Sequence, residues 1–274
     1  MDNYSFFDTT DGARIAYRID GGSKDAADKP VLVLSNSIGT DLHMWDAQIP
    51  AFSQHFRVLR YDARGHGASS VPPGPYSLDR LGEDVVDLLD HLHIARAHFL
   101  GLSLGGIVGQ WLGVHAATRI DRLILSNTAP YLGPAEVWDA SIAAVLQARD
   151  MRETAQTFLR NWFPAHMLGD GDSANDAAHA LVAPFRKTLL ATNRHGLAGS
   201  WAAVQQTDLR RAIADITRPT LVIAGEHDTV TAAAFSRTMV ETIPGARLHV
   251  FPAVHLSNVE FPEAFSAAVI AFLE

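Results

Sequence analysis

The amino-acid sequence predicts an α/β fold with a mostly parallel central sheet, and three observations lead to this class. Short apolar runs such as Val31–Leu34 have the composition of strands that are buried on both faces. These runs alternate with segments of helical periodicity, which is the pattern of repeated β-α-β units. Between about residues 130 and 208 no segment has a strand pattern, so we expect helices inserted into the sheet-based core.

The first two strands are expected over residues 4–9 and 13–19. Asp11-Gly12 between them is a turn signal, so these strands should form an antiparallel hairpin. The later strands form the parallel part of the sheet, and they are expected over residues 31–34, 57–61, 97–102, 122–127, 220–224 and 247–251.

Three helices of the core can be placed from apolar spacing and end signals. Ser77 is suited to cap a helix that runs to about His91, because apolar residues then recur every three or four positions. Further helices are expected over residues 105–115 and 263–273. The core should therefore comprise residues 1–130 and 209–274.

The insertion is expected to form a helical cap over residues 131–208. It has helical periodicity, a turn at Gly169–Asp172, and three tryptophans at positions 138, 162 and 201. Because a cap forms the roof of a substrate cavity, at least one tryptophan, with Trp138 the first choice, is expected to line it.

Charge and composition narrow the classes of partner. The 274 residues contain 22 Lys and Arg against 30 Asp and Glu, a formal net charge of −8. An acidic chain without a long basic run is a poor candidate for binding nucleic acid or anionic membranes. No apolar stretch approaches the roughly 20 residues that span a bilayer. Without cysteine the chain has no disulfide or catalytic thiol, and residues 1–5 do not resemble a signal peptide, so we expect a cytoplasmic protein.

The strongest chemical signal is the pentapeptide Gly101-Leu102-Ser103-Leu104-Gly105. It matches G-x-S-x-G, and it lies directly between a predicted strand and a predicted helix. This context is that of the nucleophile elbow, a strained turn that holds a serine hydroxyl above the sheet. Ser103 is therefore the candidate nucleophile.

A serine hydroxyl needs a base, and the base needs a third group to orient it. In this class of site the acid follows the serine and the histidine comes last. Asp228 and His255 occur in that order, each just after a predicted strand, where open α/β sheets place their functional loops. Glu226 is an alternative acid, but the shorter Asp228 is better suited to a fixed contact with His255.

An acyl-transfer site also needs donors for the oxyanion. One should be the backbone N–H of Leu104, the residue after the nucleophile. The loop after the strand at residues 31–34 reads Ser35-Asn36-Ser37-Ile38-Gly39-Thr40, and it points to the N–H of Ile38 as the second donor.

Metal and nucleotide cofactors are not expected. His91, His93 and His227 lack the spacing of a metal-binding cluster. No G-x-G-x-x-G or G-x-x-x-x-G-K-[ST] phosphate loop is present. The predicted chemistry needs none of these groups.

These motifs together resemble the 3-oxoadipate enol-lactonase family of the α/β-hydrolase superfamily, over essentially the whole chain. The elbow, residues 62–67 and residues 225–228 match at the level of the superfamily. More specific matches lie at residues 35–40, 136–139, 196–199 and 255–260. Ile38 replaces the usual leucine, and Trp201 is bulkier than the residue expected there.

The resemblance implies an α/β-hydrolase fold that opens an enol-lactone ring to give 3-oxoadipate in aromatic degradation. That small substrate carries a carboxylate, which a local arginine would hold best. The candidate cations of the insertion are Arg149, Arg152, Arg160, Arg186, Lys187 and Arg194. Arg194 is the one we expect to reach the cavity.

Two alternatives stay open at this level. One is a general carboxylesterase, or a related hydrolase of another small ester or lactone, since one catalytic triad serves many substrates. The other is a non-catalytic ligand receptor built on the same fold. Neither alternative changes the expected positions of the candidate site residues.

Overall fold

An eight-stranded sheet forms the centre of the molecule in a computed structural model, which describes residues 4–21, 29–168 and 176–274. The spatial order of the strands is β1-β2-β4-β3-β5-β6-β7-β8. Their bounds are β1 Ser5–Asp8, β2 Arg14–Asp20, β3 Val31–Ser35, β4 Arg57–Tyr61, β5 Ala97–Leu102, β6 Ile120–Ser126, β7 Thr220–Gly225 and β8 Arg247–Phe251. All eight predicted strands are present, with ends within two residues of those expected.

The sheet is antiparallel at one edge and parallel elsewhere. β1 pairs with β2 and β2 with β4 in antiparallel register, whereas every neighbouring pair from β4 to β8 is parallel. The predicted N-terminal hairpin is thus confirmed. The carboxyl ends of β3, β5, β6, β7 and β8 all lie along one edge, where the loops that follow them come together.

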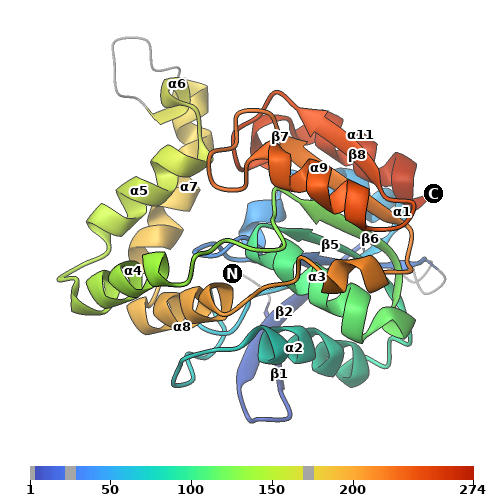
Figure 1. The fold of residues 1–274 in the computed structure, drawn as a ribbon, viewed down its shortest axis with the longest axis horizontal. Helices are drawn as coiled ribbons and strands as arrows, with labels where there is room; N and C mark the ends of the chain where they lie inside the picture. Colours follow the sequence, from blue (N-terminus) through green and yellow to red (C-terminus); the bar gives the residue numbers. More distant parts are fainter. Residues whose placement is uncertain (1–3, 22–28, 169–175) are drawn as a thin grey trace.

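Helices cover both faces of this sheet (Figure 1). Those of the core are α1 Ile49–His55, α2 Leu78–His91, α3 Leu104–His115, α9 Ala233–Thr242, α10 Ser257–Glu260 and α11 Pro262–Leu273. Apolar residues of α2, α3 and α9 share one hydrophobic cluster, and those of α1 and α11 share the other. Within β3, Val31 and Val33 contribute to the first cluster while Leu32 and Leu34 contribute to the second, so both faces of the strand are buried.

Among the described residues, five α-helices lie between β6 and β7 in the chain. They are α4 Glu136–Gln147, α5 Arg152–Trp162, α6 Ala165–Leu168, α7 Asp176–Ala191 and α8 Arg194–Gln205. Figure 1 shows them gathered to one side of the sheet. The two ends of the insertion meet in an isolated antiparallel bridge between Tyr131 and Asp208. The predicted turn at Gly169–Asp172 lies outside the described residues.

Helix α8 is held against the core by a contact between two glycines. Gly65 lies in the loop after β4 and has a φ of +80°. A Cβ on Gly65 would lie 2.6 Å from the Cα of Gly196, and one on Gly196 would lie 2.2 Å from the Gly65 carbonyl oxygen. The backbones therefore meet with no room for a side chain between them.

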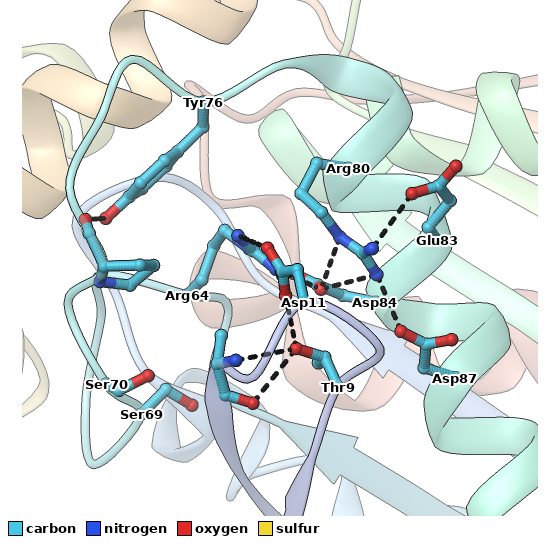
Figure 2. A network of polar contacts seen from close by, with 12 residues as sticks. Thr9, Asp11, Arg64, Ser69, Ser70, Tyr76, Arg80, Glu83, Asp84 and Asp87 are labelled. Carbon is cyan, nitrogen blue, oxygen red and sulfur yellow. Dashed lines mark hydrogen bonds and ion pairs between the residues drawn. The ribbon is translucent and has the colours of Figure 1, made fainter.

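The loop after β4 is also held in place by the buried side chain of Arg64. Its guanidinium donates to both carboxylate oxygens of Asp84 on α2 at 2.6 Å, and to both oxygens of Asp11 in the β1–β2 turn at 2.9 and 3.0 Å. Arg80 extends the network to Asp84 and Asp87 (Figure 2). One side chain thus connects the hairpin, α2 and the loop that supports α8.

The predicted helix ends agree closely with the structure. Ser77 caps α2, and its side chain accepts a hydrogen bond from the Arg80 N–H. The short helices α1 and α10 were not expected, because few residues in each carry a periodic signal. No helix among the described residues is long and apolar enough to cross a lipid bilayer.

Candidate active site

Ser103 lies at the junction of β5 and α3 in a strained backbone conformation. Its φ of 57° and ψ of −114° are unusual for a residue with a side chain. The flanking glycines are sterically required: a Cβ on Gly101 would lie 2.0 Å from the Gly105 carbonyl oxygen, and one on Gly105 would lie 2.2 Å from that of Ser35. This geometry is that of a nucleophile elbow.

The loop after β3 lies directly beside the elbow. The Gly105 N–H donates to the Asn36 carbonyl oxygen at 3.0 Å. The Asn36 side chain is itself fixed, since it donates to the Tyr61 carbonyl and accepts from the Trp45 indole. Among the hydrogen bonds between described residues, none uses the N–H of Ile38 or Leu104. Both residues line the cavity that contains Ser103, so two backbone donors are free there.

Asp228 and His255 form a buried pair on the loops after β7 and β8. The distance from His255 Nδ1 to Asp228 Oδ2 is 2.8 Å. The His255 side chain is 1% exposed and the Asp228 side chain 0%. The N–H groups of Val230 and Thr231 donate to Asp228 Oδ1, and the Thr231 hydroxyl donates to Oδ2. Glu226, the alternative acid, is exposed.

The environment keeps Asp228 ionised. Burial opposes the charge of this carboxylate, but the charge and hydrogen bond of His255, with the hydrogen bonds from Thr231, lower its pKa to about 2. His255 Nε2 has no hydrogen-bond partner among the described residues. An imidazole held at Nδ1 by a carboxylate and unpaired at Nε2 has the arrangement of a general base.

Two residues that contact the pair of Asp228 and His255 were not predicted from the sequence. They are Asn127 and Thr231. Asn127 follows β6 with a φ of 43°, and its amide donates to Asp228 Oδ2 at 3.2 Å and to the Val254 carbonyl at 3.2 Å. Its oxygen accepts from the Ser126 and Ser257 hydroxyls. A signal was present, because Asn127 follows a parallel strand as Asp228 and His255 do.

A cavity of about 500 Å³ lies between Ser103 and the inserted helices. Its aromatic wall consists of Trp138, Phe158 and Trp201; the rings of Phe158 and Trp201 are stacked 6.1 Å apart at 12°. Trp138 thus lies where expected, and its indole N–H donates to the Leu132 carbonyl at 2.7 Å. The bulky Trp201 also faces this cavity.

The expectation for Arg194 is wrong. Arg194 does not line the cavity; its guanidinium donates to the Ala148 carbonyl at 2.8 Å, on the side of an outer depression of about 320 Å³. The cation that reaches the cavity wall is Arg149. Sequence patterns could not distinguish the two, since the choice depends on how α4, α5 and α8 pack.

No cluster of three or more potential metal ligands occurs within residues 4–21, 29–168 and 176–274. His91 shows an ordinary structural role instead, since its ring stacks on Phe7 with centroids 5.3 Å apart.

Comparison with known proteins agrees with this architecture. Residues 30–262 match the family model described as the alpha/beta hydrolase fold. The chain belongs to the α/β-hydrolase family. This α/β-hydrolase is 41% identical over 248 residues to 3-oxoadipate enol-lactonase 2 of Acinetobacter baylyi, and the match covers 90% of each chain. The resemblance and the fold class predicted from the sequence are thereby confirmed.

Two solved structures are similar over nearly the whole α/β-hydrolase chain. One is a hydrolase from Pseudomonas aeruginosa PA01, with a TM-score of 0.93 and 64% identity over 99% of this chain and 98% of that one. The other is the enol-lactonase from Burkholderia xenovorans LB400, with a TM-score of 0.91 and 39% identity over 98% and 99%.

Proposed function

We propose that this α/β-hydrolase is a serine esterase that opens the ring of 3-oxoadipate enol-lactone to give 3-oxoadipate. The observation that carries the proposal is the strained Ser103 at the wall of a cavity, beside two unused backbone N–H groups. The buried pair of Asp228 and His255 supports it. The substrate is inferred from the enol-lactonases at 41% and 39% identity.

In the first half of the proposed reaction, the lactone forms an ester with the enzyme. His255 Nε2 takes the proton from Ser103 Oγ as that oxygen attacks the lactone carbonyl carbon. The N–H groups of Ile38 and Leu104 stabilise the resulting oxyanion. When the intermediate collapses, the ring C–O bond breaks, and the enol oxygen receives the proton from His255. The enol then tautomerises to the ketone.

In the second half, water releases the product. His255 Nε2 takes a proton from a water molecule, whose oxygen attacks the acyl carbon. The bond to Ser103 Oγ breaks, and Ser103 recovers its proton from His255. Asp228 holds the imidazole in one orientation and stabilises its cationic form in both halves. His255 and Ser103 carry the protons of the acylation and deacylation steps, so these two steps use no cofactor.

We propose that residues 131–208 act as the cap over this reaction. Trp138, Phe158 and Trp201 provide an apolar wall that excludes water from the oxyanion, and hydrogen bonds to the oxyanion are stronger in such surroundings. The small anionic lactone would lie between this wall and Ser103.

The test is hydrolysis of freshly generated 3-oxoadipate enol-lactone beside p-nitrophenyl acetate. We expect kcat/KM for the lactone to exceed that for the simple ester by several orders of magnitude. We also expect Ser103→Ala to lose roughly 10⁴-fold or more in kcat for both. Turnover of the ester without the lactone would reject the substrate and leave a general carboxylesterase. A Ser103→Ala variant as active as the parent would reject the nucleophile.

A further inference from the structure

The cavity is lined by both apolar and polar side chains. Ser103 lines it together with Ile38 and Leu104 and with apolar residues such as Leu132 and Val230. Helix α5 contributes Phe158 and three uncharged polar side chains, those of Thr154, Thr157 and Asn161. These three positions are three and four residues apart, so they lie on one face of the helix. Such a mixed lining can accommodate a substrate that has polar groups beside its ester.

Arg149 is the one Lys or Arg among the described residues that line this cavity. It directly follows Ala148, the C-cap of α4, and it is exposed. Within the described part of the chain, its guanidinium forms no ion pair or hydrogen bond. In contrast, Arg152 pairs with Asp150, and Arg194 donates to the Ala148 carbonyl. The guanidinium of Arg149 is thus free to bind an anion.

Two carboxylates, those of Asp150 and Glu153, also line the cavity, and they differ in their partners. Asp150 accepts from the Arg152 N–H at 2.9 Å, and its other oxygen lies 3.6 Å from Arg152 Nε. Glu153 lines both this cavity and the surface depression between α5 and α7 that contains Arg186. Glu153 therefore brings a negative charge to the cavity that Arg149 lines, and this charge should weaken the binding of anions there.

We propose that Arg149 binds the carboxylate of the substrate and so selects monoanionic esters and lactones over neutral ones. This inference rests on the function proposed above, because it assumes that the ester group lies at Ser103. Arg194 acts indirectly, by holding the carbonyl of the residue before Arg149. Arg149 also lines the outer depression, together with Asp150, Arg194 and His195.

The test uses two esters of matched length, the p-nitrophenyl monoester of succinic acid and p-nitrophenyl butyrate. They differ chiefly by one terminal carboxylate, and neither depends on the lactone. We expect Arg149→Gln to lower kcat/KM for the monoester roughly 10- to 100-fold, mainly through KM, as for loss of one charge-assisted contact. For the butyrate the change should be less than about threefold.

Three further measurements separate a bound carboxylate from a general effect of charge. Arg160→Gln removes the same charge from an exposed position of α5 that does not line the cavity, and it should leave both rates unchanged. Glu153→Gln should act in the opposite direction and raise kcat/KM for the monoester. Added salt should reduce the parent's preference for the monoester, but much less in Arg149→Gln.

Equal loss on both esters in Arg149→Gln, or no loss on either, would overturn the proposal. If the lactone is not hydrolysed but the monoester still depends on Arg149, the proposed substrate fails and this inference stands. If the lactone is hydrolysed and Arg149→Gln leaves its KM unchanged, the proposed function stands and this inference fails.

Discussion

The side-chain amide of Asn127 donates to Asp228 Oδ2 at 3.2 Å, and so connects the loop after β6 to the acid of the candidate site. The same amide donates to the carbonyl of Val254, the residue before His255. Its oxygen accepts from the Ser257 hydroxyl at 2.9 Å. One buried amide thus joins the ends of three parallel strands, and it fixes Asp228 relative to the histidine loop.

Substitution of Asn127 tests whether this connection contributes to activity. Asn127→Ala should lower kcat about tenfold with little change in KM, because one hydrogen bond to a charged acceptor is lost. Asn127→Asp should lower kcat more, roughly 100-fold, since a second carboxylate beside Asp228 disfavours its ionised form. Ser257→Ala removes a partner of Asn127 without adding charge and is the matched control. An Asn127→Asp variant no worse than the Ala variant would exclude the electrostatic role.

The two candidate acids can be separated by neutral substitutions. Asp228→Asn should reduce kcat by roughly 10³- to 10⁴-fold, because an amide stabilises the cationic imidazole poorly. Glu226→Gln should leave kcat within about twofold, since the Glu226 side chain is exposed. Steady-state kinetics on p-nitrophenyl acetate is sufficient for both variants. The opposite ranking would assign the role to Glu226.

Because the backbone at Ser103 is strained, we expect that a glycine at this position abolishes activity but relieves the strain and raises stability. Ser103→Gly and Ser103→Ala should both be inactive, but only glycine adopts a φ of 57° without steric cost. The Gly variant should therefore be more stable than the Ala variant by about 1 kcal/mol in free energy of unfolding. Urea denaturation of the two variants measures the difference. Equal stability would mean that the elbow is not strained.

The Arg64 network predicts a stability that depends on pH. The hydrogen bonds from Arg64, aided by one from Thr9, outweigh burial and hold the pKa of Asp11 well below its usual value of 3.8. The folded state therefore favours the ionised carboxylate, and this contribution is complete above about pH 4 and decreases as the pH falls further.

Asp11→Asn tests this contribution. Because Asp11 is 40% exposed, we expect a loss of only about 1 kcal/mol at pH 7. The difference from the parent should shrink below pH 4, as measured by urea unfolding at several pH values. Asp215→Asn, at an exposed position outside the network, serves as the control. A difference that does not vary with pH would indicate packing rather than charge.

Trp201 is expected to limit the length of the acyl chain. Trp201→Ala should enlarge the cavity and raise the ratio of kcat/KM for p-nitrophenyl hexanoate over the acetate by roughly tenfold, because more methylene groups can be buried. Trp201→Phe retains a ring beside Phe158 and should change the ratio less. A ratio that falls in the Ala variant would show that Trp201 binds the acyl chain rather than limits it.

Sequence patterns predicted the sheet and the positions of the candidate site residues, because both depend on local order along the chain. The central parallel strands are short apolar runs; Ser103 follows one directly, and Asp228 and His255 lie in the loops just after β7 and β8. Asn127 obeys the same rule, but an asparagine after a strand does not by itself suggest chemistry.

The cap was not predictable at the same level of detail. Arg149 and Arg194 are both exposed cations next to helix ends, and the choice between them depends on the packing of three helices. Helical periodicity fixes which face of a helix is apolar, but it does not fix which neighbour covers that face. Contacts between helices that are distant in sequence are therefore known only from the structure.

The contact between Gly65 and Gly196 has a consequence for exchanging parts between relatives. Each glycine occupies the space that a Cβ on the other would need, so neither position can accept a side chain while the two backbones stay in contact. A cap transplanted from another hydrolase would dock on this core only if a glycine arrives at the Gly196 position. The segment from α4 to α5, which carries Arg149, contains no glycine, so an exchange of this segment has to preserve its packing against α8 rather than a close approach of two backbones.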